Sequence, residues 1–205
     1  SHLVGTLPTP GIAYLTRHDH ADAGIVISAS HNPYHDNGIK VFSHDGFKLS
    51  DEQEERLEEH ILQGRLTDHP PASADLGRAV RVEDAGLRYA AFLRDTFPAD
   101  LSMKGLKIVL DTANGATFKV APETFDQLGA DVTVINDTPD GLNINADCGS
   151  QHTAGLEQQV KETGAAIGLA FDGDGDRLIA VDEKGHRITG DQILLICAKG
   201  LKDRN

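Results

Sequence analysis

The sequence predicts an α/β protein with largely parallel sheets covered by helices. Short apolar runs of strand length alternate with amphipathic segments of helix length, which is the pattern of βαβ units. Two segments rich in serine or aspartate directly follow such apolar runs, at the strand ends where α/β sheets hold ligands. A polar stretch at residues 65–80 contains Pro70 and Pro71 and predicts a linker. The chain therefore divides into residues 1–80 and 81–205.

The first part predicts two helices and two strands. Thr9, followed by a proline, predicts the cap of a helix that ends near residue 17. Residues 24–27 and 38–42 are apolar and predict strands. Ser50 and Gln53 form a capping-box pattern before a second helix, which ends at residue 64. That helix has one apolar stripe, made of Leu57, Ile61 and Leu62.

The second part predicts four strands and four helices. The strands are expected at residues 107–111, 132–135, 167–171 and 178–182. The helices are expected at residues 85–96, 117–128, 153–163 and 191–198, the last two capped by Thr153 and Asp191. The loop between the last two strands is too short for a right-handed crossover, so these two strands could instead be antiparallel in an otherwise largely parallel sheet.

The composition limits the classes of partner. Lysine and arginine total 19 against 32 aspartates and glutamates, which gives a net charge of −13. This charge disfavours a nucleic acid or an anionic membrane as partner. No run approaches the roughly 18 consecutive apolar residues of a membrane span, and no signal peptide is visible. Two cysteines, Cys148 and Cys197, favour a reducing cytoplasm. We interpret the ten histidines as exposed side chains rather than as a zinc site.

Residues 172–177 read Asp-Gly-Asp-Gly-Asp-Arg, between two predicted strands. The carboxylates of Asp172, Asp174 and Asp176 can converge because the intervening glycines permit a tight backbone. Converging anionic oxygens repel one another unless a hard cation lies between them, and Mg²⁺ suits a few carboxylates plus a phosphate oxygen. A solvated acidic turn is the alternative. A calcium loop is excluded because its sixth position, which requires glycine, is Arg177.

The second notable segment, residues 28–33, reads Ser-Ala-Ser-His-Asn-Pro and follows a predicted strand. Its proline breaks regular structure and holds Ser30 on a turn. A serine hydroxyl needs a nearby base or electrostatic assistance to act as a nucleophile, and His31 and Lys40 are close in sequence. An ordinary Ser/Asn turn is the alternative interpretation.

Together, the two segments resemble the α-D-phosphohexomutase superfamily, in which such loops carry a phosphoserine and hold Mg²⁺. The sequence is most similar to the branch that acts on glucosamine phosphates, at residues 27–34, 36–40, 140–145, 148–150 and 190–193. The resemblance covers the whole chain but only part of the four-domain family protein. It implies two three-layer α/β/α units with largely parallel mixed sheets, the first incomplete. Residues 1–80 would be the end of domain 1 with a linker, and residues 81–205 domain 2.

The resemblance implies an isomerase that interconverts glucosamine 6-phosphate and glucosamine 1-phosphate through a sugar bisphosphate. Ser30 would carry the phosphoryl group, and its phosphate would bind Mg²⁺ together with Asp172, Asp174 and Asp176. His31 and Lys40 are candidates for proton transfer or for contacts to the phosphoserine. Arg177 is a candidate for binding a phosphoryl oxygen or orienting an aspartate.

The resemblance also implies that the sugar- and phosphate-recognition domains 3 and 4 are absent. We therefore expect the isolated chain to be inactive, and its exposed domain 1 surface to favour self-association. Other readings remain open at this stage. These are a phosphomannomutase or phosphoglucomutase of the same superfamily, a non-catalytic module that retains the metal site, and a phosphatase-like hydrolase.

Overall fold

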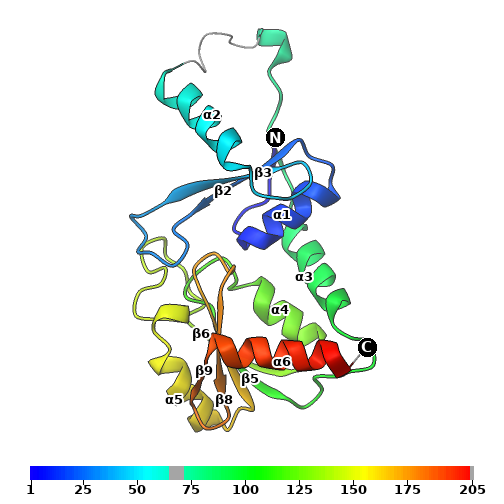
Figure 1. Ribbon diagram of the computed structural model, residues 1–205, viewed down its shortest axis with the longest axis vertical. Coiled ribbons are helices and arrows are strands. Elements are labelled where there is room, and N and C mark those ends of the chain that lie inside the picture. Colours follow the sequence, from blue (N-terminus) through cyan, green and yellow to red (C-terminus); the bar gives the residue numbers. More distant parts are fainter. Residues whose placement is uncertain (65–71, 204–205) are drawn as a thin grey trace.

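The computed structural model describes residues 1–64 and 72–203, which form two α/β units stacked along the long axis (Figure 1). The upper unit in that view contains β1 (His2–Leu3), α1 (Thr9–His18), β2 (Ala23–Ser28), β3 (Gly38–Ser43) and α2 (Asp51–Leu62). A short 3-10 helix (Ser73–Asp75) and β4 (Val80–Arg81) follow. The lower unit contains α3 (Ala85–Thr96), β5 (Lys107–Asp111), α4 (Val120–Gln127), β6 (Asp131–Ile135), a 3-10 helix (Gly149–Gln151), α5 (Ala154–Thr163), β7 (Ile167–Phe171), β8 (Leu178–Asp182), β9 (Arg187–Ile188) and α6 (Gly190–Asp203).

The lower unit is built on a five-stranded mixed sheet with the order β6-β5-β7-β8-β9. Strand β5 pairs in parallel with both β6 and β7, whereas β8 is antiparallel to β7 and β9. Of the two arrangements that the sequence leaves open for the strands around residues 172–177, the antiparallel one is therefore observed. Because β5 and β7 run in the same direction, the loops that follow them emerge at the same edge of the sheet.

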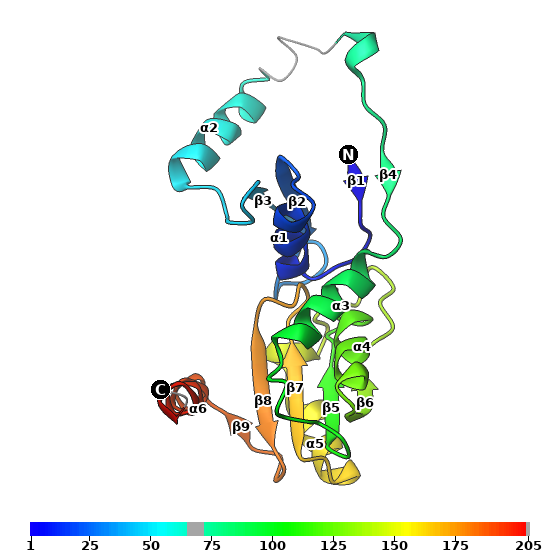
Figure 2. The same cartoon turned by 90° about the vertical axis from the view of Figure 1, so that its right-hand side faces the viewer.

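Helices cover both faces of this sheet. On one face, Leu156 and Val160 of α5 pack with Val109, Ala170 and Val181. On the other face, α4 packs over Ile108, Leu110 and Leu169, and α3 packs against α4. Figure 2 shows the sheet between these helices. The apolar character of β5 follows from this burial, since Ile108, Val109 and Leu110 are all fully buried.

The upper unit contains a two-stranded antiparallel ribbon, in which Ala23 pairs with Ser43 and Ser28 with Gly38. Its inner face, with Val26 and Phe42, is buried. Gly24 lies on the same face. A Cβ at this position would collide with Thr16 of α1, which explains why the residue is glycine. The opposite face carries Ile25, Ile27 and Ile39, which are 64%, 75% and 69% exposed. The alternation of buried and exposed residues is that of a strand with one covered face.

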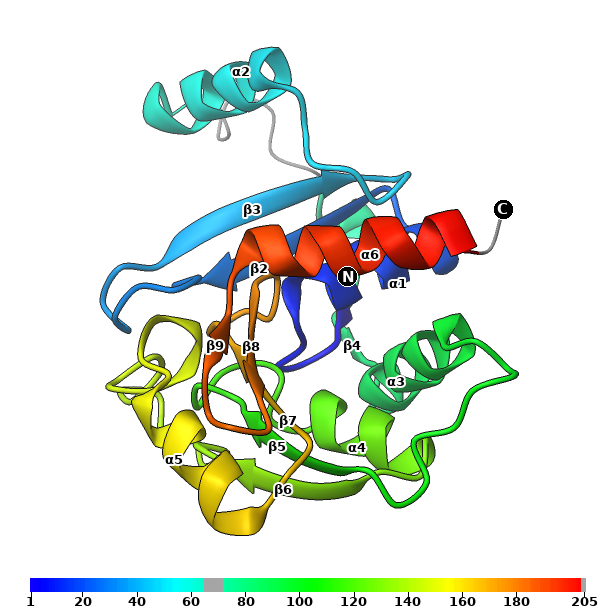
Figure 3. The same ribbon diagram turned by 60° about the horizontal axis from the view of Figure 1, so that its bottom comes forward.

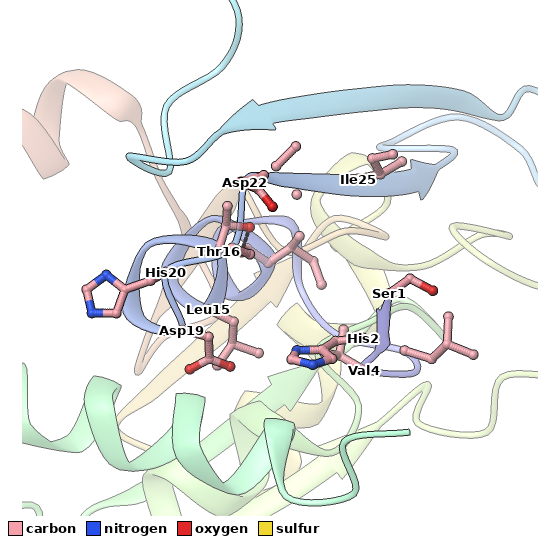
Figure 4. A pocket seen from close by; sticks show the side chains of 14 residues that line it. Ser1, His2, Val4, Leu15, Thr16, Asp19, His20, Asp22 and Ile25 are labelled. Carbon is pink, nitrogen blue, oxygen red and sulfur yellow. Dashed lines mark hydrogen bonds between the residues drawn. The ribbon is translucent and has the colours of Figure 1, made fainter. Parts of the chain in front are cut away.

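A groove of about 620 Å³ separates β1 from β2. It is lined by the two strands and by Ile12, Leu15 and Thr16 of α1 (Figure 4). Within residues 1–64 and 72–203, β1 pairs only with β4, and β2 pairs only with β3. Each strand therefore presents an unpaired edge of backbone N–H and C=O groups to this groove.

Three helix starts differ from the sequence predictions, and one of them is that of α4, which begins at Val120 rather than at residue 117. The helix α1 begins at Thr9 itself, with Pro8 at the cap position and no side-chain cap. At α6, Thr189 and Gln192 exchange hydrogen bonds between side chains and backbone, which is the capping-box pattern. Thr189, and not Asp191, therefore caps α6, which also extends five residues past the predicted end at residue 198. The capping box that begins at Ser50 is confirmed.

Helices α2 and α6 have few contacts with the rest of the chain. Figures 2 and 3 show α2 standing clear of the β2–β3 ribbon, and its predicted apolar stripe is not buried. Part of the predicted linker, residues 65–71, lies outside the described residues. Only Ile193 of α6 packs on the sheet, while Leu194, Leu195 and Ile196 are exposed. No helix among the described residues is long and apolar enough to cross a membrane.

Candidate active site and metal centre

The serine loop, residues 29–37, begins where β2 ends and leads back into β3. Ser30 has a φ of 52°, in the left-handed region. For a residue with a Cβ this conformation costs about 1–2 kcal/mol, so surrounding contacts must hold it. One of these contacts is local, since the Ser30 N–H donates to Ser28 Oγ at 2.8 Å. The Ser30 hydroxyl lies 3.4 Å from His31 Nδ1.

The acidic loop, residues 172–177, is the hairpin connection between β7 and β8, whose ends pair at Phe171 and Leu178. The backbone N–H of Arg177 donates to Asp172 Oδ1 at 3.0 Å, and Gly175 N–H donates to the Asp172 carbonyl. Gly175 has a φ of 69°, which glycine adopts without strain. The loop therefore folds on itself and directs its three carboxylates to one side.

The three carboxylates form a candidate metal centre. Asp172, Asp174 and Asp176 each offer an oxygen, and these oxygens lie within 4.8 Å of one another. Asp172 and Asp174 are buried, yet Asp172 Oδ2 and Asp174 Oδ1 have no hydrogen-bond partner among the described residues. A buried anionic oxygen without a partner is costly, and a hard cation is the ligand that such oxygens suit. The residues present therefore fit a metal ion.

The upper unit reaches this centre through three side chains that converge on Asp174. Its Oδ2 atom accepts hydrogen bonds from Thr9 Oγ1 at 2.6 Å and Ser28 Oγ at 2.9 Å. Lys40 Nζ lies 2.6 Å from the same oxygen and 3.0 Å from Asp176 Oδ2. Because Lys40 is on β3 and the aspartates follow β7, the ion pairs join the two units.

The surroundings shift the pKa values of the two buried carboxyl groups in opposite directions. Burial raises the pKa of Asp172 to about 6, against the opposing hydrogen bond from the Arg177 N–H. Burial also opposes ionisation of Asp174, but hydrogen bonds from Lys40, Thr9 and Ser28 outweigh it and lower the pKa. Within the described residues no salt bridge reaches Asp172, so this is the carboxylate that a bound cation would stabilise most.

The backbones of the two loops are in close contact. A Cβ on Gly173 would lie 2.6 Å from the Ser30 carbonyl oxygen, so only glycine fits there. The Gly173 carbonyl in turn accepts from Ala116 N–H at 2.7 Å, in the turn after β5. From the loop after β6, Asn145 Nδ2 donates to the carbonyls of Ser30 and Asn32.

The structure brings most of the predicted site residues together. Ser30, His31 and Lys40 come from the upper unit, and the three aspartates come from the lower one. The backbone N–H of Arg177 donates to the Asp172 carboxylate. The Arg177 side chain, by contrast, is half-exposed, with Nε 3.9 Å from Asp176 Oδ1. Among residues 1–64 and 72–203, no hydrogen bond or ion pair links the Ser30 hydroxyl to an aspartate.

Sequence reasoning missed three residues at this contact: Thr9, Ser28 and Asn145. The local sequence predicts a helix cap at Thr9, but its hydroxyl donates to Asp174 instead. Ser28 sits two residues before Ser30 and looks like a strand end. Asn145 lies in a sequence segment shared with the family, but a single asparagine in a long loop gives no signal about its partners. These hydrogen bonds can be identified only from the structure, because they cross between the two units or link residues that are in contact across them.

Two family models match the chain. The α/β/α domain I of phosphoglucomutase/phosphomannomutase matches residues 1–68, and the α/β/α domain II matches residues 88–185. The chain belongs to the phosphoglucomutase/phosphomannomutase family. The predicted resemblance to this superfamily is confirmed.

Relatives and solved structures agree with this family. A phosphoglucosamine mutase from Syntrophobacter fumaroxidans is 64% identical over 99% of this chain and 45% of its own length. One from Syntrophus aciditrophicus is 60% identical over 98% of this chain and 44% of its own length. The crystal structure of a phosphoglucomutase/phosphomannomutase family protein from Burkholderia thailandensis, 27% identical, superposes with a TM-score of 0.80 over all of this chain and 44% of that protein. The chain thus spans less than half the length of these relatives.

We predict that Gly173→Ala weakens divalent-cation binding. The new Cβ would meet the Ser30 carbonyl at 2.6 Å and Asn145 Nδ2 at 2.7 Å, so the loops must separate. Such overpacking costs about 1–3 kcal/mol, so we expect roughly a tenfold loss of affinity by titration calorimetry. Gly155→Ala is the control, because nothing lies within 4 Å of a Cβ there. Equal affinities in both variants would contradict the close contact.

Proposed function

We propose that this chain is the part of a phosphoglucosamine mutase that carries its phosphoserine and its metal centre. The full enzyme would interconvert glucosamine 6-phosphate and glucosamine 1-phosphate through a bisphosphate intermediate. The observation that carries the proposal is the convergence of Thr9, Ser28 and Lys40 on Asp174, which brings the serine loop against the carboxylate cluster. The names of relatives that are 54–64% identical favour glucosamine phosphates over other hexose phosphates.

Ser30 is the phosphoryl carrier in this proposal. A hydroxyl oxygen of the sugar phosphate attacks the phosphorus on Ser30, forming a new O–P bond as the bond to Ser30 Oγ breaks. The proton of the sugar hydroxyl ends on Ser30 Oγ, and the product is a sugar bisphosphate. The bisphosphate then reorients in the site, and its other phosphate is transferred to Ser30 by the reverse step. Positioning and charge stabilisation are what this transfer mainly requires.

The side chains around Ser30 fit distinct roles. His31 Nδ1 lies 3.4 Å from Ser30 Oγ and is placed to relay the proton. Lys40 supplies positive charge. Burial alone would lower the pKa of Lys40, but its hydrogen bonds to Asp174 and Asp176 outweigh burial and raise the pKa. Arg177, whose half-exposed side chain lies beside Asp176, would bind a phosphoryl oxygen or orient that aspartate. Bound Mg²⁺, held by the three aspartates and a phosphate oxygen on Ser30, would neutralise charge on the transferred group.

Other parts of the proposal concern organisation. We place the boundary between the family's first two domains near residue 80, between the segments that match domains I and II. We also propose that the protein is located in the cytoplasm. Self-association of the isolated chain is supported by the unpaired edges of β1 and β2, and by the exposed isoleucines of the β2–β3 ribbon.

Phosphorylation is predicted to occur at Ser30. In the full-length enzyme, intact-mass measurement and peptide mapping should locate one phosphate on this residue. Ser30→Ala should abolish it, because the accepting hydroxyl is lost. Ser28→Ala is the matched control, since Ser28 is the last residue of β2, directly before the serine loop, and is proposed only to hydrogen-bond to Asp174 and Ser30. Stoichiometric phosphate on Ser28 would overturn the assignment.

Magnesium binding is predicted to depend on Asp174. In the phosphorylated full-length enzyme, Asp174→Asn should abolish the heat of Mg²⁺ binding in titration calorimetry, because one anionic ligand is removed from the cluster. Affinity in the wild type should also fall when Ser30 lacks its phosphate. Asp126→Asn, an exposed change on α4, is the control. Unchanged Mg²⁺ affinity in Asp174→Asn would count against the site.

The isolated 205-residue chain is predicted to be inactive. Turnover requires contacts to the sugar and to its distal phosphate, and these raise the rate only when they are held in place. A coupled assay with glucosamine 6-phosphate and a bisphosphate activator should therefore show no mutase activity. Sedimentation velocity should show association that increases with concentration. Mutase rates near those of a full-length homologue would refute the predicted inactivity. A monomer at all concentrations would refute the predicted self-association.

A further inference from the structure

Asn145 occupies a fixed position in the lower unit. It lies in the loop between β6 and α5 and is only 9% exposed. Its backbone N–H donates to the Ala113 carbonyl at 2.9 Å, just after β5. Its φ of 57° is left-handed, a conformation that asparagine tolerates better than most residues. The same loop is also tied down at Gly149, whose N–H donates to the buried carboxylate of Asp111 at 2.8 Å.

The side chain of Asn145 crosses to the other unit. Its Nδ2 atom donates to the carbonyl oxygens of Ser30 and Asn32, each at 2.9 Å. A primary amide has two N–H donors on one nitrogen, so both are used here. An aspartate of the same shape would instead place a carboxylate oxygen against two carbonyl oxygens, which repel it. An alanine would leave both carbonyls without this donor.

These hydrogen bonds complement those on the opposite side of Ser30. The Ser30 N–H donates to Ser28 Oγ, and the Ser28 hydroxyl donates to Asp174. The Ser30 carbonyl is held by Asn145 and also abuts Gly173. The left-handed residue that carries the reactive hydroxyl is therefore held through both of its peptide groups. Asn145 of the lower unit holds one side directly, and Ser28, which is hydrogen-bonded to Asp174 of the lower unit, holds the other.

We propose that Asn145 is a positioning residue for phosphoryl transfer at Ser30, an inference that rests on the function proposed above. Asn145 does not contact the reacting hydroxyl. It fixes the backbone on either side of His31, and so sets the direction in which Ser30 Oγ faces the carboxylate cluster. Because misplacement of about 1 Å can cost on the order of 100-fold in rate, loss of these hydrogen bonds should reduce turnover rather than substrate binding.

The test compares Asn145→Ala and Asn145→Asp with Asn143→Ala in the full-length enzyme. Asn143 lies in the same loop, and the hydrogen bonds of its side chain to described residues stay within that loop, with Thr138 and Asp140. We expect kcat to fall by about 10-fold to 100-fold in both Asn145 variants, with KM for the sugar phosphate unchanged. Asn143→Ala should retain kcat. A kcat equal to wild type, or a rise in KM alone, would overturn the proposal.

Hydrogen exchange separates this inference from the proposed function. Peptides that cover residues 29–34 should exchange at least tenfold faster in both Asn145 variants than in wild type and in Asn143→Ala. This measurement needs no substrate, so it decides the role of Asn145 even if the wild-type enzyme does not turn over glucosamine phosphates. Equal exchange of the loop in all four proteins would overturn the proposal. If Asn145→Ala does not fold, Asn145→Asp, which keeps the side-chain shape, supplies the comparison.

Discussion

The site depends on one buried carboxylate, that of Asp174. Its Oδ2 atom accepts from Thr9 and Ser28 and pairs with Lys40, and all three belong to the other unit. A buried carboxylate is stable only when its charge is paired and its oxygens are hydrogen-bonded. The upper unit provides both, so the docking of the two units through Asp174 also brings the serine loop to the acidic loop. Hydrogen bonding to Asp174 and placement of Ser30 are consequently the same structural event.

The charges at this contact are divided between the units. The chain as a whole is strongly acidic, with a net charge of −13. The acidic loop contains three carboxylates. Lys40 from β3 forms ion pairs with two of them, Asp174 and Asp176, and offsets part of their negative charge. Asp172 has no such partner among residues 1–64 and 72–203, and burial raises its pKa to about 6. The cluster is therefore incompletely neutralised by the protein, and a cation with a phosphate oxygen as a further ligand would complete it.

The sequence predicted elements whose pattern is local. The capping box at Ser50, the hairpin around residues 172–177 and the central strand at residues 107–111 all follow from short-range spacing. Contacts made across the units could not be predicted in this way. Thr9 beside a proline is a sound helix cap by local rules, but Asp174 competes for its hydroxyl. The exposure of α2 was missed for the same reason, because an apolar stripe shows that a helix can pack and not what it packs against.

The fold leaves some apolar surfaces uncovered but buries two carboxylates of the site. The exposed isoleucines of the β2–β3 ribbon and the leucines of α6 have no covering layer among the described residues. Asp172 and Asp174, by contrast, are buried by the hairpin, the turn after β5 and the serine loop, all within this chain. Formation of the carboxylate cluster therefore requires only contacts that the chain already makes. Under the proposed function, metal binding and turnover would therefore be separable, because binding of a phosphosugar needs additional positive charge.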